Sequence, residues 1–321
     1  MANTKIEWAN KVWNPVTGCT KVSAGCKNCY AETYAKRFWK KRKFTDVQCH
    51  NNKLDQPLHW KKPARIFVNS MSDLFHPDVP FEFIWEIYHI MMSKAPWHTY
   101  IVLTKRPERA KEFFDWWFSF PPHKPSDIIP IGEYKNIWLG VSVEDQKTAD
   151  ERIPLLLQTP AAVRFISAEP LLGKIELTDM QNRNYLHRAT GRFNREKLNW
   201  VICGGESGKN ARPMHPGWVR SLRDECKSAN VPFFFKQWGE WLPDELGETV
   251  LYENGKTISR TKFITDEDTN SFFAIAISRY GKKKAGRLLD GTEYNEFPDF
   301  SRIITHNPQS QAGGCPRPPV C

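Results

Sequence analysis

The sequence lacks long apolar runs. No stretch of about 18 consecutive apolar residues occurs in the 321 residues. The first fifteen residues, MANTKIEWANKVWNP, also lack the apolar core that a signal peptide needs. These absences exclude a membrane-spanning helix, and we expect a cytoplasmic protein with no membrane partner.

Cysteine is also sparse, with eight residues in the whole chain. A chain of this length buries a sizeable core without disulfides, and the spacing does not resemble a secreted disulfide scaffold. In a reducing cytoplasm the thiols stay free to bind metal. Three cysteines are crowded between residues 19 and 29, and the others are scattered: Cys49, Cys203, Cys226, Cys315 and Cys321. The last two lie in a proline-rich end, where we expect them to be exposed and without function.

Acidic residues are outnumbered, with 36 Asp and Glu against 46 Lys and Arg, a net charge of +10 and 13% aromatic residues. Such a composition suits a polyanion whose bases stack on aromatic rings, although the same charges would also solvate exposed helices. The run YAKRFWKKRKF (34–44) carries both features. It predicts either a grip on a phosphate backbone or a solvated helix with its aromatic side chains turned into the core.

Six short apolar runs, each ending in polar residues, alternate with helical patterns, and the cysteines follow an earlier strand. This alternation is typical of a parallel sheet covered by helices. It predicts an α/β fold, a parallel (β/α) barrel that is either partial, with six units, or full and TIM-like, with a doubly wound sheet as the alternative. The runs are 64–76, 98–110, 136–145, 162–173, 198–208 and 231–241.

The pattern changes after Trp241. We expect a barrel domain over residues 1–242 and an irregular C-terminal extension over residues 243–321. Its most ordered piece would be SRYGKKKAGRLLDG (278–291), and its last fifteen residues a loose end.

Polar residues gather at the predicted strand ends. In a parallel barrel these ends share one face, where functional side chains collect, although Ser and Asp there also serve as helix caps. Capping explains Lys105, Glu144, Glu169 and Lys236 less well, because each follows an apolar run directly. The full set is Ser70, Ser72, Asp73, Thr104, Lys105, Arg106, Ser142, Glu144, Ser167, Glu169, Glu206, Ser207, Lys236 and Gln237.

The stretch GCTKVSAGCKNCYAE (18–32) holds Cys19, Cys26 and Cys29. A structural zinc site usually takes four ligands, often from two C-x-x-C pairs, and here the second pair is missing. Cys49 and His50 are the nearest candidates for a fourth ligand. Three thiolates without an obvious fourth suit an iron–sulfur cluster in which one iron stays open to another ligand.

Several motifs together resemble the radical S-adenosylmethionine superfamily and, more closely, the phage-associated three-Cys-motif proteins of the DUF5131 type. The motifs are WNPVTGC, GCKNCYAE, SMSDLFH, LTKRPER, ISAEPLLG, GGESGKNARPM and FFFKQWG, with further matches at GKKKAGRLLDG and EYNEFP. Two features depart from the superfamily. The cysteine spacing is C-x6-C-x2-C instead of C-x3-C-x2-C, and GGE (204–206) follows the sixth run instead of the second strand.

The resemblance implies a radical enzyme, for which we expect a nucleic acid or nucleotide as the molecule that is modified or repaired. A 4Fe-4S cluster on Cys19, Cys26 and Cys29 would bind S-adenosylmethionine, and one-electron reduction by an electron donor would yield methionine and a 5′-deoxyadenosyl radical. The expected cofactor-binding residues are Tyr30, Ser70, Ser72, Asp73, Ser142, Glu144 and Glu169, and the expected catalytic or substrate-binding residues are Lys105, Glu206, Lys236 and Gln237.

Two other functions remain open from the sequence. One is a zinc-dependent nucleic-acid-binding protein without catalysis. The other is a sugar-phosphate enzyme on a TIM barrel, with Glu169 and Lys236 as an acid/base pair; it leaves the cysteines without a role.

Overall fold

A computed structural model describes residues 4, 6–119, 134–178, 184–187, 197–252, 254–259 and 274–299. Structural statements below concern these residues. The last fifteen residues of the chain, with Cys315 and Cys321, lie outside them.

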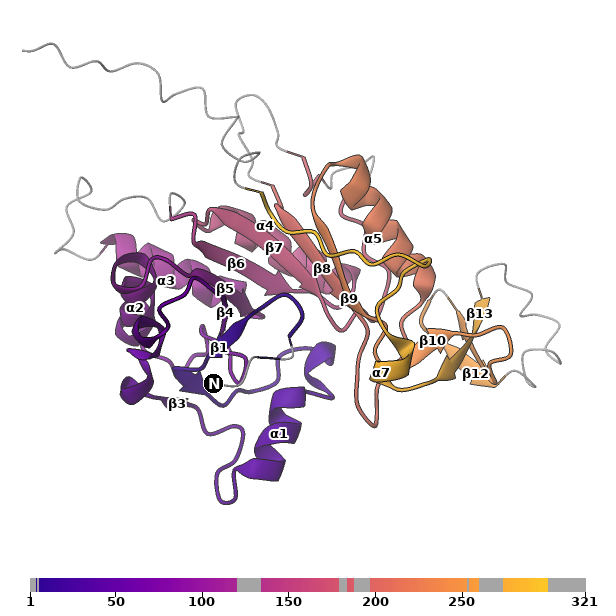
Figure 1. Cartoon of the computed structure of the whole chain (residues 1–321), viewed down its shortest axis with the longest axis horizontal. Coiled ribbons are helices and arrows are strands. Elements are labelled where there is room, and N and C mark those ends of the chain that lie inside the picture. The colour runs from indigo at the N-terminus through magenta and orange to yellow at the C-terminus, as the bar shows by residue number, and fades with distance from the viewer. Residues whose placement is uncertain are drawn as a thin grey trace, which may run out of the picture.

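The core is a seven-stranded parallel sheet with the order β1-β4-β5-β6-β7-β8-β9, curled into a half-barrel and flanked by helices (Figure 1). A strand lies in each of the six predicted runs, and a first strand precedes the cysteines, so the predicted parallel α/β sheet is confirmed. Every residue of β6, β7 and β8 is buried, which explains why these runs are mostly apolar. The strands are β1 (Lys11–Trp13), β4 (Arg65–Val68), β5 (Thr99–Thr104), β6 (Ile137–Ser142), β7 (Val163–Ala168), β8 (Trp200–Gly204) and β9 (Phe233–Gln237).

Helices connect most of these strands, and all of them except the first cover one face of the sheet. Alternate strand residues such as Ile66, Val102 and Ile166 pack in one core with helix residues such as Phe113 and Leu222. The helices are α1 (Tyr30–Phe38), α2 (Phe81–His89), continued by the π-helical turn η4 (Ile90–Lys94), α3 (Pro107–Ser119), α4 (Gln146–Gln158) and α5 (Pro216–Ser228).

The other face of the sheet is filled with aromatic side chains. Phe67 of β4 and Trp138, Phe165, Trp200 and Phe234 of β6 to β9 form a second core, to which β5 adds Ile101. Trp138 and Trp200 meet edge to face, with ring centroids 5.6 Å apart. A side chain at position 140 would not fit beside them, because a Cβ there would lie 2.5 Å from the Phe165 ring. The hollow of the half-barrel is therefore a packed core.

A closed, full TIM-like barrel is not what the described residues form. Closure needs β1 to pair with β9, but residues 293–298 lie along β9 instead. The Phe235 amide donates to the Tyr294 carbonyl at 3.0 Å, Phe234 bridges Asn295, and the Trp200 indole donates to the Glu296 carbonyl at 2.8 Å. This segment thus occupies the edge of β9 that would pair with β1 in a closed barrel.

The extension is more regular than predicted. It holds a four-stranded antiparallel sheet with the order β10-β13-β11-β12. Its strands are β10 (Trp241–Pro243), β11 (Thr249–Tyr252), β12 (Thr257–Ser259) and β13 (Ala274–Arg279), and the short helix α7 (Lys282–Ala285) follows. The expectation of an irregular extension was thus wrong. Its strands are short and only partly buried, so their sequences show no clear alternation of apolar and polar residues. A domain boundary at residue 242 stays a prediction.

Two short strands frame the cysteine stretch. β2 (Val16–Thr17) pairs antiparallel with β3 (Gln48–Cys49), and short 3-10 turns lie at Ala24–Cys26 (η1), Asn51–Lys53 (η2) and Gln56–His59 (η3). Within the part of the chain described, no helix combines the length and apolar character that crossing a membrane requires.

The segment along β9 predicts a stability effect. Phe297 contacts Trp200 and Phe234, with ring centroids 5.2 and 5.5 Å away. Since Phe297 is half-buried, Phe297→Ala should lower the free energy of unfolding by about 2 kcal/mol, less than the usual cost of a fully buried phenylalanine. Urea denaturation measures this, with Phe118→Ala as the control because Phe118 is an exposed aromatic residue of α3. Equal effects of both substitutions would contradict the packing described.

Candidate functional site

The cysteine loop, residues 18–29, runs from β2 to α1 and lies against the carboxyl ends of the sheet strands. Gly18 opens it with a φ of 98°, and a Cβ there would lie 2.4 Å from the Asp46 carbonyl oxygen, so only glycine fits. Cys29 is the residue just before α1. Three sets of polar contacts hold the loop against the sheet.

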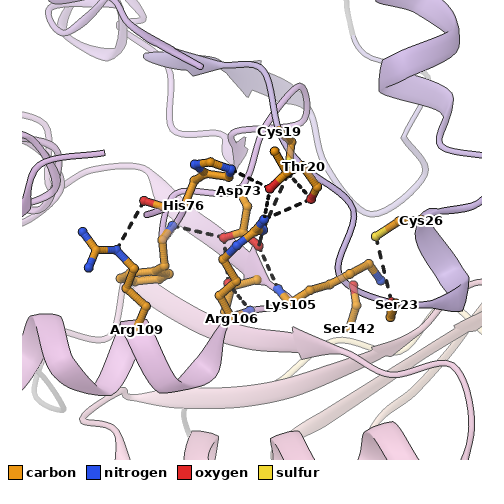
Figure 2. Close-up of polar contacts among 12 residues, drawn as sticks. Cys19, Thr20, Ser23, Cys26, Asp73, His76, Lys105, Arg106, Arg109 and Ser142 are labelled. Carbon is orange, nitrogen blue, oxygen red and sulfur yellow. Dashed lines mark hydrogen bonds and ion pairs between the residues drawn. The ribbon is translucent and has the colours of Figure 1, made fainter. Parts of the chain in front are cut away.

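The first set joins the loop to the ends of β4 and β5 through Arg106 (Figure 2). The buried guanidinium donates to Asp73 Oδ2 at 3.2 Å, to the Thr20 carbonyl at 3.0 Å and to Thr20 Oγ1 at 2.9 Å. Its Nη1 also lies 3.6 Å from Cys19 Sγ. Asp73 in turn accepts from Thr104 Oγ1 at 2.7 Å and from the Lys105 amide at 2.9 Å. Arg106 thus links two strand ends to the start of the cysteine loop.

His76 completes this set. The Asp78 amide donates to His76 Nδ1 at 3.2 Å, so in the neutral ring the proton is on Nε2, which lies 2.8 Å from Thr20 Oγ1. Burial lowers the pKa of His76, and the nearby Arg106 lowers it further. A neutral His76 therefore donates to Thr20.

The second set centres on Glu144, which is 0% exposed. Its Oε1 accepts from Ser23 Oγ of the loop at 2.8 Å and from Lys105 Nζ at 2.5 Å, and its Oε2 accepts from Arg152 Nη1 at 3.1 Å. Burial alone would raise the pKa of Glu144, but Lys105, Arg152 and Ser23 outweigh it, so the pKa lies below its ordinary value. A Cβ at Gly25 would lie 2.4 Å from Glu144 Oε1, so the loop backbone rests directly on this carboxylate.

The third set reaches β8. Asn28 Nδ2 donates to Glu206 Oε2 at 3.1 Å and to the Asn210 carbonyl at 2.8 Å. Arg212 holds both Glu206 oxygens, at 2.8 and 2.6 Å. Burial would raise the pKa of Glu206, but the hydrogen bonds from Arg212 and Asn28 lower it below its ordinary value.

Tyr30, at the start of α1, ties the end of the loop to β4. Its hydroxyl donates to the Ser70 carbonyl, although 59% of the residue is exposed. Burial of the hydroxyl, with Cys29 and Glu169 nearby, raises the pKa of Tyr30.

A separate pair lies at the ends of β7 and β9. Lys236 Nζ donates to both Glu169 oxygens, at 2.8 and 2.9 Å, and Gln237 Nε2 lies 3.3 Å from Glu169 Oε1. The pair is mostly buried but retains some exposure on both side chains. The acid/base partners expected from the sequence do meet.

The three cysteines share the loop but do not converge. Cys19, Cys26 and Cys29 are half-buried free thiols. In the described ranges, no group of three or more His, Cys, Asp or Glu side chains is placed to hold a metal ion. The donor set still fits a thiolate-bound metal by its chemistry, since three accessible thiols share eleven residues and a guanidinium lies beside the first. Burial and Asp73 raise the pKa of the Cys19 thiol to about 11, with Arg106 opposing them, so this thiol is protonated without metal.

The predicted strand-end residues are therefore gathered at one edge of the sheet. Not all of them face outward. The hydroxyls of Ser70 and Ser72 bond to Asn14 and to the Val16 carbonyl, and Ser142 is buried with its carbonyl bonded to Arg152. Whether these residues bind a cofactor stays a prediction.

Sequence reasoning missed the partners that hold this edge together: Asn14, Thr20, Ser23, Asn28, His76, Arg152 and Arg212. Arg152 lies inside α4 and carries no local signal of its role. His76 and Arg212 stand a few residues past strand ends, so a wider window after each strand would have found these two.

The chain belongs to the DUF5131 family, described as proteins of unknown function, whose family model matches residues 3–298. The match includes both the half-barrel and the antiparallel sheet. No curated protein and no solved structure matches the chain. The family match confirms the DUF5131 resemblance, and it carries neither a reaction nor a phage association.

Removing the Glu144 carboxylate would leave Lys105 and Arg152 without their shared buried partner. Glu144→Ala should therefore destabilise the protein by about 3–5 kcal/mol in urea denaturation. Glu112→Ala is the matched control, because Glu112 is exposed and its ion pair with Arg109 is long, at 3.8 Å. If Glu144→Ala lowered the free energy of unfolding as little as the control does, the buried network would be contradicted.

The Cys19 thiol gives a second test. With its pKa at about 11, alkylation of Cys19 in metal-free protein should rise about a hundredfold between about pH 7.5 and about pH 9.5, as the thiolate fraction grows. Peptide mass spectrometry after timed iodoacetamide treatment measures the rate at this residue. An alkylation rate of Cys19 that levels off above about pH 8.5, the ordinary pKa of a cysteine thiol, would contradict the buried environment.

Proposed function

We propose that this DUF5131 protein is a radical S-adenosylmethionine enzyme, with a 4Fe-4S cluster held by Cys19, Cys26 and Cys29. The observation that carries the proposal is the anchoring of the cysteine loop. Side chains of the loop bond to residues after β4, β5, β6 and β8, so the three thiols lie beside a row of charged side chains. A loop that only closed a structural zinc site would have no need of these anchors.

When bound, the cluster would pass one electron from a donor to S-adenosylmethionine, yielding methionine and a 5′-deoxyadenosyl radical that abstracts hydrogen from the substrate. The chain's own residues would position and protect this chemistry. Arg106 favours the thiolate of Cys19, and Asp73 holds Arg106 in place. The aromatic core below the strand ends keeps water from entering beneath the site.

The cofactor contacts follow from which charged groups retain exposure. Asp73 and Glu144 have both oxygens engaged, so we assign them to positioning Arg106, Lys105 and Ser23 around the cofactor. Lys105 keeps 19% of its side chain exposed and would meet the methionine carboxylate. Tyr30, Ser70, Ser72, Ser142 and Glu169 complete the expected cofactor set.

The substrate would lie on the side of β8 and β9. Glu206 and Lys236 are held there by Arg212 and Glu169, so each is oriented before substrate binds. Lys236 Nζ would hold a proton facing the substrate. A nucleic acid or nucleotide is the expected substrate class.

One observation favours a second candidate, a zinc-dependent nucleic-acid-binding protein. The pairing of β2 with β3 sets Cys49 opposite Val16, and His50 Nε2 lies 2.7 Å from Thr17 Oγ1. Both potential fourth ligands thus lie close to the start of the cysteine loop. Zinc would close the site, whereas the proposed enzyme needs an open position.

Anaerobic reconstitution with iron and sulfide tests the proposal. The wild-type protein should bind iron, absorb near about 400 nm and produce 5′-deoxyadenosine from S-adenosylmethionine when reduced. Cys19→Ala, Cys26→Ala and Cys29→Ala should each lose all three properties, because each removes one of three ligands. Cys49→Ala is the control and should retain them.

Stoichiometric zinc that is lost in Cys49→Ala, with no iron taken up, would overturn the enzyme in favour of the second candidate. A full cluster in Cys19→Ala would show that the ligand set is wrong.

A further inference from the structure

Helix α1 presents its large side chains outward and its small ones inward. Ala31 and Ala35 are buried, at 4% and 1% exposure, and they are the only buried residues of the helix. Tyr34 and Phe38 are 51% and 53% exposed. This inverts the usual amphipathic pattern, in which bulky apolar residues face the core. In Figure 1, α1 also lies apart from α2, α3, α4 and α5.

The exposed rings form an aromatic stripe, defined as Tyr30, Tyr34 and Phe38. These residues are four apart, so they share one side of the helix. The rings of Tyr34 and Phe38 have centroids 4.4 Å apart, and the Arg37 guanidinium lies 5.2 Å from the centre of the Phe38 ring. Exposed apolar residues scattered singly need no explanation, but a contiguous group of them marks a binding surface.

The stripe is surrounded by positive charge. Residues 20–45 hold eight Lys and Arg residues and one acid, Glu32, which already pairs with Lys21 and Lys36. The exposed side chains of Arg37, Lys40 and Lys41 form no ion pair with an acidic side chain among the described residues. The surface thus joins flat aromatic rings to excess positive charge.

Two residues of the basic run serve the fold instead. Arg42 donates to the Thr17 carbonyl and Thr17 Oγ1, at 2.6 and 2.8 Å, and lies 4.3 Å from the centre of the Trp39 ring. Trp39 also packs near Phe44, with centroids 5.9 Å apart. Phe38 is therefore exposed, whereas Trp39 is half-buried beside Arg42 and Phe44.

We propose that the aromatic stripe binds single-stranded nucleic acid. Bases would stack on Tyr34 and Phe38, and phosphates would contact Arg37, Lys40 and Lys41. A duplex hides its base faces, so it cannot use the rings in this way. A membrane fits less well, because the exposed side of this nine-residue helix has no aliphatic residue to enter the acyl region.

The stripe leads to the candidate site. Tyr30 begins it and bonds to the Ser70 carbonyl at the end of β4, next to Cys29. A strand stacked on Tyr34 and Phe38 would have its neighbouring nucleotide at the edge where the cysteine loop lies. The inference names the substrate class of the proposed enzyme, and only this last step rests on that function.

Binding of fluorescently labelled single-stranded DNA and RNA dodecamers, measured by anisotropy at two salt concentrations, tests the stripe. The double variant Tyr34→Ala/Phe38→Ala should weaken binding about tenfold or more. Tyr34→Leu/Phe38→Leu keeps apolar bulk without flat rings and should lose binding similarly, which covers the case in which the alanine variant fails to fold. Phe118→Ala is the control and should bind like the wild-type protein.

Charge is tested separately. Arg37→Gln/Lys40→Gln/Lys41→Gln should reduce the slope of log affinity against log salt by about 2, since each phosphate contact on a single strand contributes about 0.7. The matching duplex should bind more weakly than the single strand, and the ring variants should bind that duplex as the wild-type protein does.

The proposal is overturned if both ring variants bind single strands like the wild-type protein, or if the duplex binds as tightly as the single strand. It is also overturned if the Tyr34 and Phe38 substitutions weaken binding to vesicles of anionic phospholipid but not binding to single strands. Iron content and 5′-deoxyadenosine formation, measured on the same preparations, separate this result from the proposed function. Ring-dependent binding in a protein that takes up no cluster would support the stripe and overturn the enzyme.

Discussion

The buried ion pair between Asp73 and Arg106 is the interaction on which the site depends. Asp73 lies in the loop after β4, Arg106 follows β5, and the same guanidinium reaches Thr20 and Cys19 in the cysteine loop. Charges taken out of water are costly unless every polar direction is satisfied, so such a pair tolerates few alternative arrangements. Glu144 is likewise a buried carboxylate, and its oxygens accept hydrogen bonds from Lys105, Arg152 and Ser23. The position of the cysteine loop is thereby set by the strand ends together with the loop's own Thr20, Ser23 and Asn28.

The rest of the fold leaves this edge as the place for chemistry. Helices cover one face of the sheet, and the aromatic layer from Phe67 to Phe234 fills the other. Residues 293–298 occupy the edge of β9 that would pair with β1 in a closed barrel. Polar groups at the strand ends thus meet the cysteine loop and α1. The same helix that continues the loop carries the aromatic stripe, so a bound strand and the thiols would share one neighbourhood.

The sequence predicted the parallel sheet well because strands buried on both faces are mostly apolar, as WVICG of β8 is. The polar strand-end residues were found because they directly follow these apolar runs. Barrel closure could not be predicted, since it depends on Tyr294 and Asn295 reaching β9 from about sixty residues away. Arg152 was missed as a partner of Glu144 because it lies inside α4, where tertiary packing alone selects it. The antiparallel sheet of the extension was missed because its strands are short and half-buried.

The central claim is that three thiolates beside the strand ends hold a cluster with one open iron. Electron paramagnetic resonance of the reduced, reconstituted protein tests it most directly, because the signal of a cluster responds to a ligand on its open iron. The account predicts a reduced-cluster signal that shifts when S-adenosylmethionine is added. The signal should not shift when adenosine, which lacks the methionine part, is added instead. A cluster signal that S-adenosylmethionine leaves unchanged would contradict the open position, and a protein that binds zinc and gives no signal would contradict the cluster itself.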